Sequence, residues 1–197
     1  TTTLTTPNNT AFAKARINDS YGAGDSNVRI GDTVDYELRL TLNEGTTSSV
    51  VLSDALPRGL RFDAIVSVNG DTVAPFDSVA PFTHATVLAP TLTGDPVTGP
   101  STLTWTIGNI VNAGDNNAAN NDFVIVYRAT VLPDAGIAHV ASTTLSNTAT
   151  MTYTSATGSA SLSSTATVTV LQPIIASLTK SEATHISGSL VNIPSTL

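Results

Sequence analysis

Apolar and polar residues alternate at every second position in several stretches of this chain. The clearest stretch is TVDYELRLTL, residues 33–42, in which apolar side chains alternate with charged and threonine side chains. A period of two residues is typical of a β-strand that buries one face and leaves the other face in water. We therefore predict a half-buried strand here, with Asp35 and Glu37 together on the solvated face.

The same pattern, interrupted by glycine, proline and asparagine, predicts a series of further short strands. They cover residues 49–54, 61–68, 102–107, 123–131, 143–154 and 161–171. Turns or loops are predicted at 43–47, 69–71 and 112–122, and an irregular proline-rich excursion over 74–100 carries one short strand near 84–88. No segment sustains the 3.6-residue period of a helix. Many short strands at regular spacing predict an all-β, immunoglobulin-like β-sandwich with Greek-key connections.

A lysine recurs in the same setting near both ends of the chain, which indicates tandem modules. The stretches TLTTPNNTAFAKAR and TVLQPIIASLTKSE each place a lysine, Lys14 and Lys180, seven residues after a proline. A start signal repeated after a whole domain is typical of repeat architectures. We therefore expect residues 1–172 to form one module. Residues 173–197 are then the first strand of a following repeat, a tail that docks on its own module or adds to the sheet of another chain, or a linker.

Composition narrows the classes of partner. The net charge is −7, which argues against a nucleic-acid surface because such a surface needs clustered lysine and arginine. The chain has no cysteine, so it has neither a disulfide nor a thiolate metal site. No apolar run reaches the ~18 residues of a membrane-spanning helix, so membrane insertion is not expected. Few lysines and an acidic balance suit an extracellular bacterial protein.

Three polar residues break the alternation, because they point toward the apolar side of their strands. Lys14, Asp54 and Asn147 each lie two positions from an apolar residue on the same predicted face. A buried unpaired charge costs several kcal/mol or shifts its pKa, so the three are best explained together.

One chemical interpretation is an isopeptide crosslink. A buried lysine that loses its charge is a nucleophilic amine, and a protonated carboxylic acid can polarise an amide carbonyl. Attack of Lys14 on the amide of Asn147, with Asp54 as the acid, would release ammonia and join the first strand to a late strand. The alternative is structural: the lysine extends to water from the sandwich edge, and the other two side chains satisfy nearby backbone groups.

Two loops are rich in aspartate and asparagine, which predicts a second kind of site. They read NDSYGAGDSN at 18–27 and NAGDNNAANND at 112–122. Oxygen ligands at close spacing suit Ca²⁺. The candidate ligands are Asp19 and Asp25 in the first loop and Asp115, Asn117 and Asp122 in the second. Neither loop has EF-hand spacing, and loops of this composition also form plain turns.

No motif in the chain indicates an enzyme. There is no nucleophile-elbow, phosphate-loop or paired catalytic carboxylate pattern. The three histidines lie far apart in the sequence, without the spacing of a metal site.

Several sequence blocks occur in an order and spacing that resemble a known family. The blocks are GDTVDYELRLTL, VVLSDALPRGLRF, TLTWTIGNI, TLSNTATMTYT and TVTVLQP…SLTKS. They resemble the bacterial surface-repeat family called DUF11 and its relative, the isopeptide-forming fimbrial D2-type domain. The resemblance covers about residues 8–180. It implies an immunoglobulin-like sandwich strung in tandem on secreted or cell-wall proteins, with Lys14, Asp54 and Asn147 at the positions that form the bond in the fimbrial relative.

Together, these patterns predict a non-enzymatic structural repeat, a stalk or spacer of a large cell-surface, fimbrial or biofilm-matrix adhesin. The alternative is a calcium-dependent adhesion module that binds a glycan or a protein. The expected partners are neighbouring modules, another copy joined through the tail, and a host or matrix ligand. The expected location is extracellular.

Overall fold

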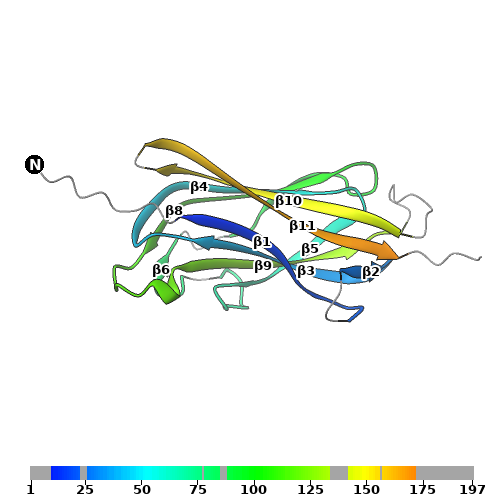
Figure 1. Ribbon diagram of the computed structural model, residues 1–197, viewed down its shortest axis with the longest axis horizontal. Helices are drawn as coiled ribbons and strands as arrows, with labels where there is room; N and C mark the ends of the chain where they lie inside the picture. The colour runs from blue at the N-terminus through cyan, green and yellow to red at the C-terminus, as the bar shows by residue number, and fades with distance from the viewer. Residues whose placement is uncertain are drawn as a thin grey trace, which may run out of the picture.

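The computed structural model describes residues 10–22, 26–76, 78–84, 88–133, 142–155 and 157–171, and their regular structure is almost entirely β-strand. Two sheets pack face to face (Figure 1). The first has the order β1 (Ala11–Asp19), β3 (Thr33–Thr41), β9 (Asp122–Val131) and β5 (Leu60–Val68). The second has the order β2 (Asn27–Arg29), β11 (Gly158–Leu171), β10 (Ser142–Ser155), β4 (Gly45–Leu56), β8 (Ser101–Asn112) and β6 (Phe82–Thr83), and β7 (Thr91–Gly94) also pairs with β8. A 3-10 turn, η1 (Ala118–Asn120), precedes β9. The chain is thus an all-β, immunoglobulin-like sandwich, as its alternation predicts.

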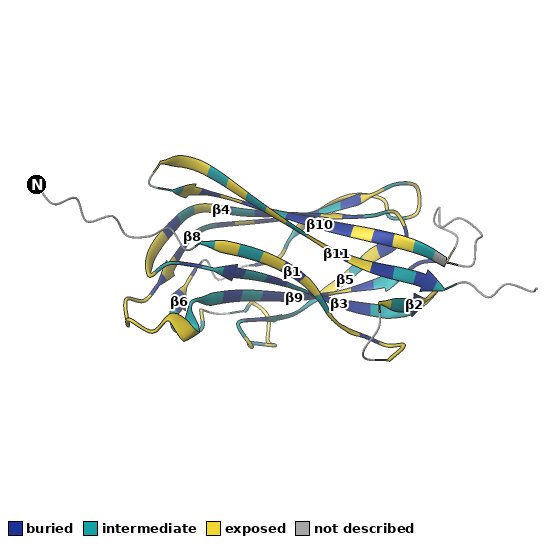
Figure 2. Ribbon diagram, viewed as in Figure 1, coloured by how far each residue is buried: buried dark blue, intermediate teal, exposed yellow. Residues whose placement is uncertain are grey.

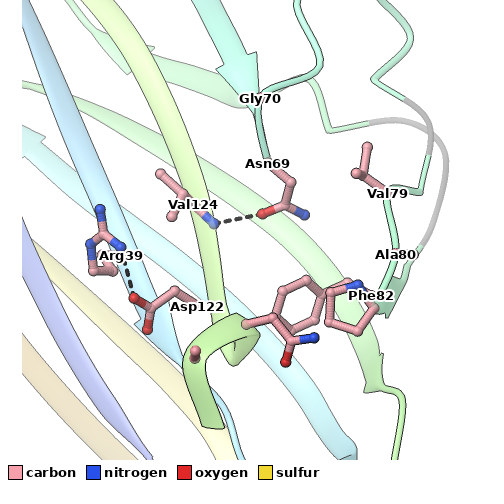
Figure 3. A pocket seen from close by; sticks show the side chains of 11 residues that line it. Arg39, Asn69, Gly70, Val79, Ala80, Phe82, Asp122 and Val124 are labelled. Carbon is pink, nitrogen blue, oxygen red and sulfur yellow. Dashed lines mark hydrogen bonds and ion pairs between the residues drawn. The ribbon is translucent and has the colours of Figure 1, made fainter. Parts of the chain in front are cut away.

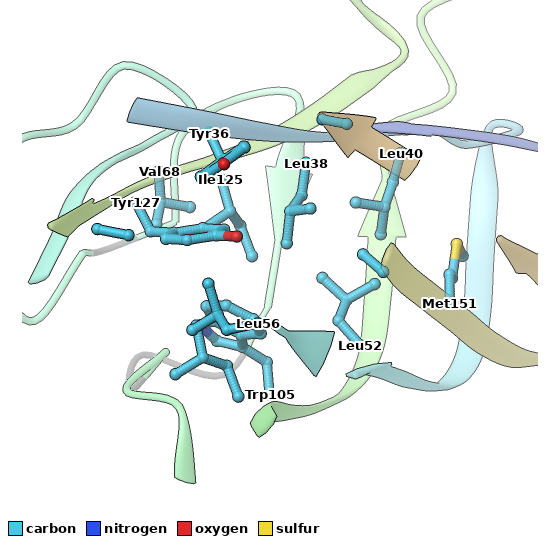
Figure 4. Packing of buried hydrophobic residues seen from close by; sticks show 14 of the residues in the cluster. Tyr36, Leu38, Leu40, Leu52, Leu56, Val68, Trp105, Ile125, Tyr127 and Met151 are labelled. Carbon is cyan, nitrogen blue, oxygen red and sulfur yellow. The ribbon is translucent and has the colours of Figure 1, made fainter. Parts of the chain in front are cut away.

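The core lies between the sheets and follows from the alternation. On β3, Tyr36, Leu38 and Leu40 are fully buried, and buried residues alternate with more exposed ones along the long strands (Figure 2). Trp105 of β8 and Tyr127 of β9 are among the largest fully buried side chains and pack with leucines from both sheets (Figure 4). Full burial of one such side chain contributes about 1.5–3 kcal/mol.

Two strands run further than the alternation predicts. β4 begins at Gly45, inside the expected turn at 43–47, and β8 continues to Asn112. The two extensions pair with each other, with Gly45 opposite Asn112. The register of this pair shifts between Thr47 and Val50, and such a bulge breaks the two-residue period on which the prediction relied.

The excursion at 74–100 differs from the prediction of one strand near 84–88. His84 and Leu88 lie outside strands, and 85–87 lie outside the described residues. Instead, the excursion contains two short strands, β6 before residues 84–88 and β7 after them, and both pair with β8. Strands of two to four residues are too short to display an alternation. The same reason explains why β2, which runs parallel to the end of β11, was not predicted.

Asp35 differs from its predicted place on a solvated face. It points outward as predicted but is buried, because Arg128 of the neighbouring strand covers it. The guanidinium donates from Nε to Oδ1 at 2.7 Å and from a terminal nitrogen to Oδ2 at 2.9 Å. Glu37 is half-buried and pairs with Arg39. The outward face of β3 therefore carries ion pairs in which arginine side chains partly shield the carboxylates from water.

The topology brings β1 of the first sheet against β11 of the second. The backbone N–H of Lys14 donates to the hydroxyl of Ser164 at 2.9 Å. Next to β11 lies β10, and next to β10 lies β4, with Ala149 directly opposite Asp54. Asn147, two residues before Ala149, shares its face of β10. Three strands thus converge on one place in the core.

Several predictions concern residues outside the described part of the chain. They are the repeated start signal at Pro7 and Lys180, the tail at 173–197 and the candidate ligand Asp25. The division into one module and a following strand therefore stays a prediction. Among the described residues, no helix is long and apolar enough to cross a membrane.

Candidate functional site

Lys14 projects from β1 into the core between the two sheets. Its side chain is fully buried, so the amine does not reach solvent. Nζ lies 2.5 Å and 2.6 Å from the two carboxylate oxygens of Asp54 and 3.0 Å from the hydroxyl of Tyr127. It also lies 5.0 Å from the ring centroid of Tyr36, where the face of the ring attracts a cation.

Asp54 faces this amine from β4 and is likewise fully buried. Besides the amine, its carboxylate accepts a hydrogen bond from the Tyr127 hydroxyl, at 2.8 Å from Oδ2. Tyr127 comes from β9, on the opposite sheet from Asp54. The carboxylate is therefore held from both sheets.

Asn147 completes the cluster from β10. It is fully buried, and its Nδ2 donates to the Tyr127 hydroxyl at 2.8 Å. Its Oδ1 has no hydrogen-bond partner among the described residues. An unsatisfied buried acceptor costs about 1–3 kcal/mol and calls for an explanation. Because Lys14 Nζ and Asn147 Nδ2 contact the same oxygen atom, the distance between them cannot exceed the sum of those two hydrogen bonds.

Burial drives both members of the ion pair toward their neutral forms. Burial lowers the pKa of Lys14 from 10.5 to about 8, although Asp54 opposes the shift. Burial also raises the pKa of Asp54, against the opposing effects of Lys14 and Tyr127. Both shifts reduce the cost of moving a proton from Nζ to the carboxylate, a transfer that leaves a nucleophilic amine beside a carboxylic acid.

Tyr127 is the member of this cluster that sequence reasoning missed. It lies in the apolar stretch FVIVYRATV, where an inward aromatic residue is expected to be ordinary core. The available signal was its hydroxyl, because a buried tyrosine needs a hydrogen-bond partner that phenylalanine does not.

The predicted calcium ligands are spread over separate local structures. Asp19 accepts backbone hydrogen bonds from Tyr21 and Gly22 and pairs with Arg16. Asn117 caps η1 by accepting from the backbone of Ala119.

The other two candidates are also engaged. The Asn120 side chain donates to Asp115 and lowers the pKa of that carboxyl. Partial burial opposes a low pKa at Asp122, but hydrogen bonds from Thr41 and Arg39 outweigh it and hold the pKa below its usual value. Within the described residues, no group of three or more histidine or acidic side chains could hold a metal ion. Calcium binding stays a prediction, tested by whether a chelator lowers the unfolding temperature.

A second candidate site is a pocket of about 390 Å³ beside the start of β9 (Figure 3). Its wall includes Asn69 from the turn after β5, Asn120 from η1, and the Arg39–Asp122 ion pair. Asn69 accepts from the backbone N–H of Val124 at 2.8 Å, which leaves its Nδ2 without a partner among the described residues. Asn120 donates to Asp115 through Nδ2, and its Oδ1 is likewise unpartnered there. The residues that line the pocket thus include one amide donor and one amide acceptor that are buried and lack partners among the described residues.

No protein-family model matches the chain, and no curated protein sequence matches it. Several solved structures share the fold. ACE19, the collagen-binding subdomain of the Enterococcus faecalis surface protein ACE, is 15% identical over 86% of this chain and 100% of that chain, with a TM-score of 0.41. The major pilin SpaD of Corynebacterium diphtheriae is 16% identical over 82% of this chain and 34% of that chain, with a TM-score of 0.44.

An enzyme is also among these structures. AvmM, which catalyses macrocyclization in alchivemycin A biosynthesis, is 9% identical over 85% of this chain and 92% of that chain, with a TM-score of 0.44. Likeness at such identities and TM-scores does not extend to function. The resemblance to the surface-repeat family rests on the sequence blocks alone.

Proposed function

We propose that this chain is a structural module of an extracellular bacterial surface, fimbrial or biofilm-matrix protein, locked by an isopeptide bond between Lys14 and Asn147. The observation that carries the proposal is the convergence of an amine, a carboxyl group and an amide in one buried site between two sheets. The sequence blocks and the positions of the three residues within them support the same reading.

The reaction balances without any external reagent. Nζ of Lys14 gives one proton to Asp54 and attacks Cγ of Asn147, and the C–Nδ2 bond breaks. An amide forms between the two side chains, and the Asn147 nitrogen leaves as ammonia after taking up one proton from the attacking nitrogen. The protein acts once on itself, so it is not an enzyme in the sense of turning over a substrate.

The bond would suit a chain that carries tension. It joins β1 in one sheet to β10 in the other, and these strands lie near the two ends of the module's sequence. A protein without cysteine has no disulfide to do this. Neighbouring modules of the same protein are the expected partners, and the tail at 173–197 is the proposed connection to them or to another copy.

The test is an intact mass of the folded chain. The wild-type protein should be lighter than its sequence by one ammonia, about 17 Da. Lys14→Arg and Asn147→Ala should each restore the full sequence mass, because each lacks one reacting group. The matched control is Lys180→Arg, which alters the other lysine of the chain and should keep the deficit. A wild-type mass equal to the sequence mass would refute the crosslink.

The pocket beside β9 favours a second candidate function, the binding of a neutral glycan. Two amide groups of its lining residues, Asn69 Nδ2 and Asn120 Oδ1, have no partner among the described residues and would match one acceptor and one donor of a ligand once the side chains turn toward it. Each hydroxyl of a sugar supplies both. The charges at the rim, on Arg39 and Asp122, already neutralise one another, which disfavours a charged ligand. Pockets of this size hold small ligands.

This second function is tested by NMR titration with neutral oligosaccharides. Asn69→Asp is the informative variant, because it keeps the oxygen that accepts from Val124 and replaces the unpartnered donor with a carboxylate oxygen. It should weaken binding about tenfold, as expected for one lost hydrogen bond. The control is Asn18→Ala at an exposed asparagine of β1. Binding that is absent in the wild type, or unchanged in Asn69→Asp, would exclude a glycan site here.

A further inference from the structure

We propose that Tyr127 is a catalytic residue of the crosslinking reaction, in which its hydroxyl carries the proton from the attacking nitrogen of Lys14 to the departing nitrogen of Asn147. This inference rests on the proposed function. It assigns a role to a group that the reaction of amine, acid and amide does not by itself require.

The hydrogen bonds of the hydroxyl carry the argument. A phenol has one proton to donate and an oxygen that can accept two. Here the proton goes to Asp54 at 2.8 Å, and the oxygen accepts from Lys14 Nζ at 3.0 Å and from Asn147 Nδ2 at 2.8 Å. The two nitrogens that exchange places on the amide carbon are therefore both bonded to this one oxygen atom.

The chemistry needs a group in this position. After attack, Nζ carries one proton too many, and Nδ2 must gain one before it can leave as ammonia. Among the described residues, the Asp54 carboxylate accepts hydrogen bonds from Lys14 and Tyr127 but not from Asn147. The hydroxyl of Tyr127 contacts both nitrogens and is thus the direct route between them.

The transfer can be written with its protons in balance. Asp54 first takes one proton from Lys14, and the amine attacks Cγ of Asn147, which places the carbonyl electron pair on Oδ1. Once Asp54 is protonated, the Tyr127 hydroxyl turns from it toward Nδ2, and its oxygen accepts a proton from Nζ while its own proton passes to Nδ2. The carbonyl reforms, the C–Nδ2 bond breaks and ammonia leaves, so that Tyr127 ends as it began.

The surroundings keep the hydroxyl protonated and in place. Burial raises the pKa of Tyr127 well above its usual value, with a further contribution from Asp54, so the proton is present at neutral pH. The ring is fully buried, with centroids 5.5 Å from Tyr36, 5.9 Å from Trp105 and 6.1 Å from Phe62. A donor fixed in this way needs little reorganisation during the reaction.

The experiment compares rates of crosslinking in full-length chains made by cell-free synthesis, followed by intact mass over time. Tyr127→Phe keeps the ring and removes the hydroxyl, and should slow the loss of ammonia at least 100-fold, the usual lower range for a general acid–base group. Tyr153→Phe is the matched control, a buried tyrosine further along β10, and should react at the wild-type rate.

Two further variants separate chemistry from folding. Tyr127→Phe in the Asn147→Ala background, which cannot crosslink, shows by its unfolding temperature what the hydroxyl contributes to the fold alone. A fluorotyrosine at position 127 keeps the hydroxyl but makes it more acidic, so the rate and its pH profile should shift while the fold is retained.

Each outcome is decisive. Tyr127→Phe that crosslinks at the wild-type rate, or a fluorotyrosine chain with an unshifted pH profile, overturns the role of Tyr127 and leaves the isopeptide bond standing. A wild-type chain that never loses ammonia overturns both proposals.

Discussion

At the scale of single residues, Lys14 and Asp54 form a charge pair that the fold does little to favour. Moving two ions from water into the protein interior carries a large desolvation cost, which an exposed ion pair does not pay. This cost lowers the pKa of Lys14 and raises the pKa of Asp54. An ion pair placed only for stability could be replaced by apolar side chains. The presence of this pair beside a buried amide is better explained by reactivity, because conversion of the lysine to an amide, with the carboxyl group left protonated, removes both charges.

This argument predicts a pH dependence that exists only without the crosslink. In Asn147→Ala, Lys14 stays a free amine with a folded pKa of about 8, below the ordinary 10.5. Between these pH values the unfolded chain binds more protons, so stability rises with pH, by about 2 kcal/mol. In the crosslinked wild type the same nitrogen is an amide and does not titrate. Urea unfolding of both proteins at pH 8 and pH 10 measures the difference.

The comparison of the two proteins cancels the titrating groups that lie away from Lys14, because their surroundings are the same in both chains. An Asn147→Ala chain whose stability falls or stays level relative to the wild type over this range would contradict the lowered pKa of Lys14.

Sequence alone could indicate three of the four polar residues of the site. Strand parity turns Lys14, Asp54 and Asn147 inward, because each breaks an apolar face that is otherwise regular. Tyr127 does not interrupt the apolar face of its strand, because an aromatic residue is expected at an inward position. The shared oxygen could not be predicted, because it depends on how two sheets face each other across the core.

At the scale of elements, the long strands were predictable and the short ones were not. β3, β9 and β10 each bury one face over nine or more residues, so the two-residue period is clear. Edge pieces such as β6 owe their position to pairing with β8, which no local pattern displays. The turn after β5 was predictable from Asn-Gly, and its φ angles of 48° and 83° are those that a tight hairpin requires.

The β7 region predicts an effect of backbone crowding. Gly94 has a φ of 87°, and a Cβ added there would lie 2.5 Å from the carbonyl oxygen of Pro100. Gly94→Ala should therefore destabilise the protein by more than the ~1 kcal/mol typical of positive φ alone. Gly70→Ala is the control, with a φ of 83° and no atom within 4 Å of the added Cβ. Chemical denaturation of the two variants ranks them, and equal losses would show that the contact at Pro100 relaxes freely.

At the scale of the whole molecule, the proposed crosslink would change how the sandwich responds to tension. β1 starts toward one end of the long axis, and β11 finishes at the other (Figure 1). Tension applied through the chain therefore enters at β1 and leaves by β11. Under such tension the hydrogen bonds between strands can break one after another. An amide bond between Lys14 of β1 and Asn147 of β10 would keep the segment between these two residues from being stretched.

The bond should also raise stability without load, by closing a loop of roughly 130 residues in the unfolded chain. Loops of this length correspond to about 4–5 kcal/mol in the chain-entropy description of crosslinks. Alternation predicts the sandwich, and strand parity predicts Lys14 and Asn147 as the residues that would close the loop. How β1 and β10 meet across two different sheets could not be predicted, because no local pattern displays the contact between sheets.

Single-molecule extension from the two termini gives the final prediction. In Asn147→Ala the whole sandwich should unravel, whereas in the wild type only the segments before Lys14 and after Asn147 can extend. The wild-type chain should lengthen by roughly 450 Å less, because about 130 residues at about 3.4 Å each stay enclosed by the bond. Lys180→Arg should behave as the wild type, and the segments outside the described residues contribute equally to all three chains. Equal extensions for the wild type and Asn147→Ala would show that no covalent link lies between β1 and β10.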